Sequence, residues 1–471
     1  MRQSCVSRVN RVGPRRRQHL GPKTCKCQKS ITKLLRCLAS LGGVKTSDDL
    51  LIESFATRAA SLRIAVVTET FPPEVNGVAM TLGRIVEGLL QRGHMVQVVR
   101  PRQTQEASEP RPGLDEVLSK GIPLPSYGEL RFGLPSKSRL GKLWAAQRPD
   151  IVHVVTEGPL GWSAVAAARK LQLPITSSFH TNFHSYSQHY GIGLLKSPIE
   201  SYLRKLHNRT QATMVPTRAM LQDLTARGYD NVTLVSRGVA IELFQPSRRS
   251  EALRASWGAL PEDPVIILVG RLAKEKNVNL VLSAYQAIKA RQPRAQLVLV
   301  GDGPLRRALQ DACPDAHFAG VRQREELATY YASADLFLFP SLTETFGNVV
   351  PEALASGLAV LSYANAAAQE LIIHNQNGVL VPTGDELAFV NAAVELALDP
   401  QRQQRLRELA PRSVAYLAWS AVSDAFEQVL RDVLSRHGQP FHSAPKGALL
   451  SVGAALPAQE RLPHAQLHTL R

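Results

Sequence analysis

Two acidic residues eight positions apart, Glu344 and Glu352, have the residue type and spacing of a polar ligand site. Between them Gly347 and Asn348 are typical of the start of a helix, and Pro351 is tolerated only in a helix's first turn. We therefore expect Glu344 in a loop and Glu352 in the first turn of the helix that follows.

The loop between the two carboxylates predicts an anion site. The backbone N–H groups of Phe346, Gly347 and Asn348 beside a helix N-terminus suit a diphosphate. Glu344 and Glu352, one on either side, could accept hydrogen bonds from sugar hydroxyls. Composition alone leaves open the alternative that these are surface acids around a helix cap.

A second polar segment, Gly-Arg-Leu-Ala-Lys-Glu-Lys-Asn at residues 270–277, follows an apolar run and opens a helical pattern. Free N–H groups at a helix start, with the cations Arg271 and Lys276, could together neutralise a phosphate. A solvated polar turn is the alternative for this segment taken by itself.

Both segments belong to a chain that alternates short apolar runs with helical patterns. Continuous apolar strands separated by helices indicate parallel sheets covered on both faces. The apolar runs lie at residues 63–68, 96–99, 151–155 and 175–179, and then at 264–269, 295–300, 336–339 and 358–361. Helical patterns lie at 78–92, 162–171, 277–291, 304–312, 324–332 and 351–356, and a last one at 414–434.

The pattern restarts once, so we predict an α/β chain with two doubly wound, Rossmann-like domains facing across a cleft. Ligands of open parallel sheets bind beyond the carboxyl ends of the strands. The expected divisions are a basic extension (1–62), two Rossmann-like domains (63–250 and 251–412), a last helical segment (413–437) and a tail (438–471).

Several motifs in order resemble the retaining glycosyltransferases of family 4, which have the GT-B fold. The resemblance covers residues 63–437. It implies an acceptor domain at 63–250, a nucleotide-sugar domain at 251–412 and a helix at 413–437 that packs back on the first domain. It rests on Glu-Thr-Phe-Gly-Asn-x-x-Pro-Glu at 344–352, Gly-Arg-Leu-x-x-Glu-Lys at 270–276 and Thr-Glu-Thr-Phe-Pro-Pro-Glu-Val-Asn-Gly at 68–77. Ser-Phe-His-Thr-Asn-Phe at 178–183 and Arg-Gly-Val at 237–239 also fit, although Ala240 replaces the Asp usual after the last motif.

The resemblance implies a role for each matching residue. The cations Arg271 and Lys276 would bind the donor diphosphate, and His180 would face the donor sugar. Three further contacts with the donor are implied. Glu344, with the amides of Phe346–Asn348, would contact the transferred sugar, Glu352 would bind the nucleotide ribose, and Gly77 would let the first loop approach the donor phosphate.

The same resemblance implies a retaining, metal-independent hexosyltransferase without a cofactor. It is most similar to bacterial GDP-mannose-dependent α-mannosyltransferases and related glycolipid enzymes, with a UDP-sugar donor as the alternative, since Asn365 stands where that branch usually has Asp. The acceptor would be a lipid or glycan hydroxyl. Residues 194–209 could form an amphipathic helix on an anionic membrane, or an ordinary helix facing the core.

Charge and composition exclude other classes of partner. Of the formal net charge of +17, residues 1–62 carry +10 and residues 438–471 carry +2, which leaves +5 for the body. No recognition motif accompanies the basic extension, so we expect no nucleic-acid partner. The Gly-Asp-Gly-Pro segment at 301–304 lacks the third glycine of a dinucleotide fingerprint, which argues against a nicotinamide-dependent oxidoreductase. We expect a cytoplasmic enzyme, peripheral on the inner face of the plasma membrane where its acceptor is a lipid.

Overall fold

The computed structural model describes residues 46–47, 50–51, 60–74, 76–103, 111–124, 127–180 and 196–437. The chain divides into two units, Met1–Ala60 and Ser61–Arg471. In the first unit the short strands β1 (Thr46–Ser47) and β2 (Leu50–Leu51) pair antiparallel. The predictions for the basic extension and for the tail therefore lie almost wholly outside the described residues.

The first half of the second unit is built on a seven-stranded sheet. Its strand order is β11-β10-β9-β8-β3-β4-β5, and every pair in it is parallel. The central strands are buried on both faces, as continuous apolar runs predict. The strands are β3 (Arg63–Val67), β4 (Met95–Pro101), β5 (Leu114–Ser119), β8 (Ile151–Val154), β9 (Ile175–Ser178), β10 (Ala212–Val215) and β11 (Val232–Leu234).

Helices and one hairpin accompany this sheet. The antiparallel pair β6 (Gly121–Leu124) and β7 (Tyr127–Gly133) is an addition that the apolar periodicity does not reveal. The helices are α2 (Gly77–Gln91), α3 (Lys137–Ala146), α4 (Pro159–Lys170), α6 (Lys196–His207) and α7 (Arg218–Ala226).

A second parallel sheet, of six strands in the order β14-β13-β12-β15-β16-β17, forms the other half. Its strands are β12 (Val265–Val269), β13 (Gln296–Val300), β14 (His317–Gly320), β15 (Leu336–Phe339), β16 (Ala359–Tyr363) and β17 (Val379–Val381). The two sheets confirm the α/β prediction of two Rossmann-like units.

Four helices of the second half begin within two residues of the predicted positions, and the last begins at Trp419 instead of residue 414. The 3-10 turns are η2 (Pro246–Arg248), η3 (Lys274–Lys276) and η4 (Ala415–Leu417). The α-helices are α8 (Glu251–Ser256), α9 (Val278–Lys289), α10 (Arg306–Ala312), α11 (Arg324–Ser333), α12 (Val349–Ala355), α13 (Ala366–Leu371), α14 (Glu386–Leu398), α15 (Pro400–Val414) and α16 (Trp419–Arg436).

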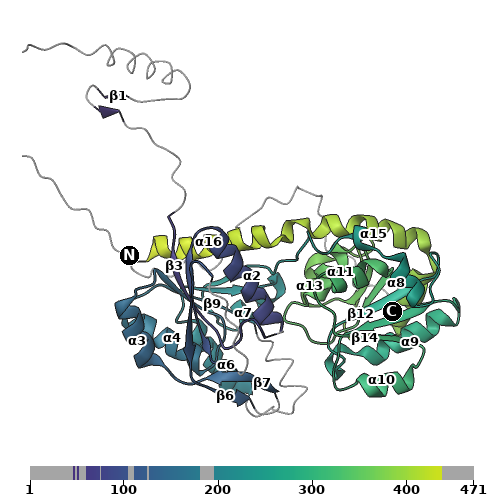
Figure 1. Ribbon diagram of the computed structural model, residues 1–471, viewed down its shortest axis with the longest axis horizontal. Coiled ribbons are helices and arrows are strands. Elements are labelled where there is room, and N and C mark those ends of the chain that lie inside the picture. The colour runs from purple at the N-terminus through teal and green to yellow at the C-terminus, as the bar shows by residue number, and fades with distance from the viewer. Residues whose placement is uncertain are drawn as a thin grey trace, which may run out of the picture. The chain divides into compact units, whose positions relative to one another are not determined.

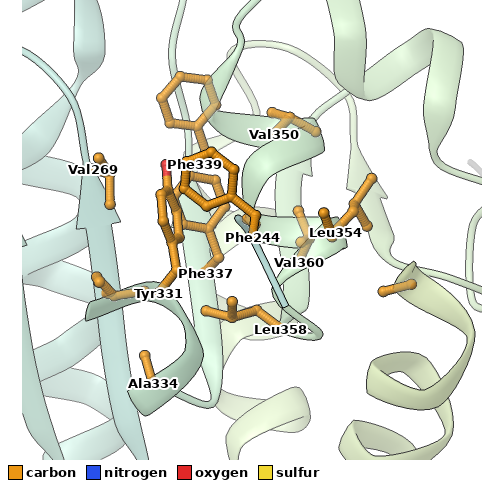
Figure 2. Packing of buried hydrophobic residues seen from close by; sticks show 14 of the residues in the cluster. Phe244, Val269, Tyr331, Ala334, Phe337, Phe339, Val350, Leu354, Leu358 and Val360 are labelled. Carbon is orange, nitrogen blue, oxygen red and sulfur yellow. The ribbon is translucent and has the colours of Figure 1, made fainter. Parts of the chain in front are cut away.

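Aromatic side chains form the centre of the core on one face of the second sheet. Figure 2 shows Phe337 and Phe339 of β15 beside Tyr331 and Phe244. The rings of Phe244 and Tyr331 meet edge to face with centroids 5.6 Å apart, a favourable geometry for aromatic pairs. This packing fixes the end of β15, from which the loop carrying Glu344 departs.

Helix α16 leaves the second half and packs against α2 of the first (Figure 1). Its apolar side chains Val422, Phe426 and Val429 are buried there with residues of β3 and β4. Arg92 at the end of α2 donates to the Ser420 carbonyl at 2.7 Å and pairs with Asp424 at 2.5 Å. Helix α16 thereby connects the two sheets a second time.

Helix α6 corresponds to the predicted amphipathic segment. Its side chains Leu203 and Leu206 are 3% and 0% exposed and pack inside the first half. The core-facing alternative therefore explains its amphipathic pattern, and an interfacial role for these two leucines is wrong. Within the described residues, every helix is too short or too polar to cross a membrane.

Candidate active site

A cavity of about 580 Å³ lies where residues following the strands of both sheets meet. Its volume is in the range of small-molecule sites. The first half contributes Glu69, Thr70, Asn76, Gly77, Val78, Arg131, Phe132, His180 and Arg237, and the second half contributes Val269, Gly270, Lys276, Phe339 and the residues from Glu344 to Val349.

Most of the predicted site residues line this cavity. Those that do are Gly77, His180, Lys276, Glu344, Phe346, Gly347 and Asn348. The other two, Arg271 and Glu352, are not among its lining residues. The sequence motifs therefore identified residues that the fold assembles from separate segments of the chain.

Lys276 and Glu344 form an ion pair on the wall contributed by the second half. Oε1 of Glu344 also accepts a hydrogen bond from Ser341 Oγ at 2.9 Å. The Leu342 N–H donates to the Glu275 carbonyl at 3.0 Å, which ties the loop after β15 to the turn η3. The cation and the carboxylate are thus positioned by two connected loops.

The backbone of residues 346–348 is the part of the loop that could bind an anion. Gly347 has φ of +86°, a left-handed conformation that glycine adopts without strain. Among the described residues, none accepts a hydrogen bond from the backbone N–H of Phe346, Gly347 or Asn348. The helix α12 that follows has seven residues, so its dipole is small and the N–H groups themselves matter more.

Asn348 differs from the expected helix cap. It lies at the start of α12, but its side chain makes no capping hydrogen bond. Its Oδ1 atom is buried without a partner in the part of the chain that the structure describes. A buried amide oxygen without a donor is costly, so this atom is available to a ligand donor group.

Gly77 is the first residue of α2 rather than a loop residue. Asn76 caps this helix, because its Oδ1 accepts from the N–H groups of Val78 at 3.1 Å and Ala79 at 2.9 Å. A Cβ on Gly77 would have only Arg237 within 4 Å, at 3.9 Å. The protein therefore leaves room there, and any requirement for glycine comes from a bound molecule.

His180 follows β9 and contacts Arg237, with the guanidinium NH2 3.2 Å from the imidazole Nδ1. Because a guanidinium can only donate, Nδ1 is the acceptor and Nε2 carries the proton. Burial, and then the charge of Arg237, hold the pKa of His180 well below 6.5. The side chain is therefore a neutral imidazole with a single N–H to donate.

Arg237 is the principal cavity residue to which the motifs gave no role. It is 6% exposed, its Nε has no hydrogen-bond partner within the described residues, and burial lowers its pKa to about 10. The guanidinium also lies over the Phe346 ring at 5.8 Å. The Arg-Gly-Val motif includes this residue. The sequence alone does not show that the fold buries its guanidinium beside His180.

Arg271 lies at the edge of the site. Its side chain is 47% exposed, and NH1 is 3.9 Å from Glu275 Oε1. Glu352 does lie in the first turn of α12, as the sequence predicted, but its Oε2 accepts a hydrogen bond from Tyr331 OH at 3.1 Å. Burial raises the pKa of Glu352 to about 7.

Titratable ligands do not gather elsewhere in a way that suggests a metal centre. In the described ranges, no group of three or more His, Cys, Asp or Glu side chains could hold a metal ion. Cys25 and Cys27, whose close spacing could form half of a metal site, lie outside the described residues.

Comparisons with known proteins identify the family. Residues 75–243 match the model described as "Glycosyltransferase Family 4", and residues 263–399 match "Glycosyl transferases group 1". The GDP-mannose-dependent alpha-mannosyltransferase of Corynebacterium glutamicum is 34% identical over 79% of this chain and 90% of its own length. The protein of the same name from Mycobacterium tuberculosis is 35% identical over 77% and 94%.

Solved structures show the same fold. Sucrose-phosphate synthase from Thermosynechococcus elongatus superposes with a TM-score of 0.65 at 20% identity, covering 79% of this chain and 99% of that one. WaaG, a glycosyltransferase involved in lipopolysaccharide biosynthesis, gives a TM-score of 0.59 at 15% identity over 78% and 99%. These matches and the two parallel sheets show that the chain belongs to glycosyltransferase family 4 and is a hexosyltransferase with the GT-B fold.

Proposed function

We propose that this enzyme transfers mannose from GDP-mannose to a hydroxyl of a lipid or glycan acceptor, with retention at the anomeric carbon. The observation that carries the donor assignment is the 34% and 35% identity to two GDP-mannose-dependent alpha-mannosyltransferases over more than three quarters of the chain. The cavity geometry supports a nucleotide-sugar diphosphate independently.

The diphosphate would lie between cations contributed by both halves. Lys276 and the N–H groups of residues 346–348 face it from one wall, and the buried guanidinium of Arg237 faces it from the other. Arg271, half-exposed at the edge, would join them when the site is filled. Positive charge held in place before reaction stabilises the nucleoside diphosphate as it departs.

The carboxylates of Glu344 and Glu352 would bind the hydroxyls of the sugar and of the ribose. Glu344 would accept hydrogen bonds from the transferred hexose. Glu352 would accept hydrogen bonds from the ribose hydroxyls once the Tyr331 hydroxyl no longer donates to its carboxylate. The Nε2–H of His180 is the donor that the neutral imidazole offers to the hexose. These roles are proposals that the burial and contacts of each side chain support.

Retention would follow if the acceptor attacked from the face that the diphosphate leaves. The departing phosphate oxygen would then take the acceptor proton, so no protein side chain need act as the base. In this arrangement the cations Lys276, Arg237 and Arg271 supply the charge that neutralises the leaving group, which is why we propose a metal-independent reaction.

A UDP-sugar is the second candidate, and Asn365 is the observation that favours it. Its Nδ2 donates to the Ser341 carbonyl at 2.8 Å. An aspartate, which the resemblance to the GDP-mannose branch would place at this position, could not donate this bond. This departure from the branch supports a UDP-sugar as the second candidate donor.

A lipid acceptor implies contact with a membrane, and we propose a peripheral one at the cytoplasmic face. The hairpin β6–β7 supports it, because Ile122 and Phe132 are cross-strand partners and are 56% and 44% exposed. Phe132 also lines the cavity, so an apolar surface continues into the site. Replacing both with Ser should reduce co-sedimentation with anionic liposomes, and unchanged binding would contradict this proposal.

The donor is tested with the purified chain, GDP-mannose or UDP-glucose, and a lipid extract as acceptor. Acceptor-dependent release of GDP, with mannose in the lipid fraction, is the expected result. Release of UDP with glucose transfer would establish the second candidate instead. Transfer from neither donor would contradict the proposed function.

A further inference from the structure

We infer that Glu69 binds the acceptor, its carboxylate receiving a hydroxyl next to the one that is glycosylated, and that the acceptor headgroup is therefore polyhydroxylated. This inference rests on the proposed transfer reaction and adds the class of its acceptor. Glu69 lies in the loop after β3 and lines the cavity on the wall contributed by the first half.

The structure fixes the Glu69 side chain in place. Its own N–H donates to Thr156 Oγ1 at 2.9 Å, and its Oε1 lies 3.5 Å from the Leu160 N–H at the start of α4. The N–H of Gly133, at the end of β7, donates to the same carboxylate. The contacts of α4 and β7 with the carboxylate hold it in one orientation, as a binding group requires.

Gly158 leaves the space that the carboxylate occupies. A Cβ at this position would lie 2.0 Å from Glu69 Oε1 and 2.1 Å from Oε2. Gly158 has φ of −71°, so its backbone conformation does not itself require glycine. Glycine is required here because the carboxylate of Glu69 occupies the space that a side chain at position 158 would need. The two residues are therefore matched to each other.

The carboxylate is not neutralised by the protein. Among the described residues no cation forms an ion pair with Glu69. Burial, with a smaller effect from the charge of Glu157, raises its pKa to about 7. A partly buried carboxylate without a neighbouring cation destabilises the folded protein. The contact of Glu69 with the start of α4 therefore does not by itself explain why an acid stands at this position.

Glu69 lies on a different wall from the donor residues of the second half, although Gly77, His180 and Arg237 of the first half are also proposed to contact the donor. Lys276, Glu344 and the loop 346–348 belong to the second half, whereas Glu69 belongs to the first and approaches the cavity with Thr70 and Arg131. A donor bound by the second half would present its sugar toward this wall. Glu69 would then contact the acceptor, which attacks this sugar.

The chemistry of a fixed carboxylate selects hydroxyl donors. A carboxylate accepts two or more hydrogen bonds, and vicinal hydroxyls of a sugar or polyol supply them. Such a site discriminates strongly against an acceptor that lacks the second hydroxyl, because the carboxylate is then left without its partner. The cations Arg237 and Lys276 in the same cavity disfavour a positively charged acceptor.

The test compares two probes, octyl α-D-mannoside with several hydroxyls and diacylglycerol with one. Glu69→Gln should lower kcat/KM for the octyl mannoside by at least about tenfold and leave the value for diacylglycerol within about twofold. Gly158→Ala should have the same effect, since its Cβ displaces the carboxylate, and the double variant should be no worse than either. The affinity for GDP, measured by calorimetry, should be unchanged and shows that the variants are folded.

The pH dependence supplies a second readout. The ionised form accepts hydroxyl hydrogen bonds and is present above about pH 7, so the KM for octyl mannoside should fall as pH rises from about 6 to about 8. Glu157 and Tyr202 of α6 interact electrostatically with Glu69, and Arg131 of β7 lines the same cavity. Glu69→Gln should remove this dependence.

The inference is overturned if Glu69→Gln alters both probes alike, alters neither, or leaves the pH dependence in place. It is also overturned if the unaltered enzyme uses diacylglycerol alone. Failure of the proposed function gives a different result, because the unaltered enzyme would then release no nucleotide with any acceptor, and the acceptor inference would fall with it.

Discussion

The guanidinium of Arg237 donates to Nδ1 of His180 across 3.2 Å, although the two residues are 57 positions apart in the chain. This bond places the imidazole proton on Nε2 and prevents the ring from accepting a second proton at Nδ1. The same guanidinium is 6% exposed and forms part of the cavity wall. One buried cation therefore sets both the charge of the site and the protonation of its histidine.

Replacing Arg237 with Met should lower kcat by roughly 100-fold, because a fixed charge facing the departing diphosphate is lost. Arg237→Lys should recover part of the rate, since it keeps the charge but not the planar geometry. The measurement is steady-state transfer at saturating donor. Equal rates for the Met variant and the unaltered enzyme would contradict the role of this residue.

The same substitution should also raise the pKa of His180. A nearby positive charge opposes protonation, so its removal shifts the pKa upward, while burial, the larger cause, still holds it below 6.5. Histidine NMR as a function of pH checks this. A pKa that stays in place in Arg237→Met would show that the two side chains are not coupled.

Glu344→Gln should reduce kcat at least about tenfold without weakening GDP binding. The reason is that Glu344 is proposed to contact the hexose, and GDP carries none. Neutralising Glu344 also leaves Lys276, its ion-pair partner, with its full charge for the diphosphate. Calorimetry with GDP and the transfer rate separate the two effects, and a tenfold loss of GDP affinity would contradict this assignment.

Donor affinity should depend on pH through Glu352. Burial raises the pKa of this carboxyl to about 7, and only the ionised form accepts from both ribose hydroxyls. The Kd for GDP-mannose should therefore fall between about pH 6 and about pH 8, where neither esterified phosphate titrates. Glu352→Gln should give a flat profile, and a persistent slope would assign the titration to another group.

The docking of α16 on α2 should be sensitive to one glycine. A Cβ on Gly88 would lie 2.2 Å from Ser423 Oγ, and both positions are in the packed contact between these helices. Gly88→Ala should lower the free energy of unfolding by about 1–3 kcal/mol, as overpacking does. Ser423→Gly should restore most of that loss in the double variant, whereas additive losses would show that the two positions do not meet.

The sequence predicted the fold well because burial of continuous apolar strands leaves a strong pattern. The strand at residues 336–339 has the predicted bounds, and the helix after Asn76 begins within one residue of its predicted start. The strands β5, β6, β7, β10, β11, β14 and β17 were missed. Most side chains of β5 are only partly buried, so its apolar pattern is weaker, whereas β10 is buried but only four residues long.

The candidate site was predictable only in part, since motifs identify residues but not their surroundings. Lys276 and Glu344 were found from local spacing. Arg237 and Glu69 were not, because their significance comes from burial against residues far away in the chain, His180 in one case and Gly158 in the other. Glu352 was placed in the correct turn, but its contact with Tyr331 depends on tertiary packing.

The most direct test of the account is calorimetric titration of the purified chain with GDP-mannose, repeated for Lys276→Met. We predict saturable binding at one site per chain, weakened at least about tenfold in the variant, because Lys276 lines the cavity where the diphosphate would lie. Exposed Lys142→Met on α3 serves as the matched control and should bind as the unaltered chain does. Equal affinity of the Lys276→Met variant and the unaltered chain, or no binding of GDP-mannose at all, would contradict the account.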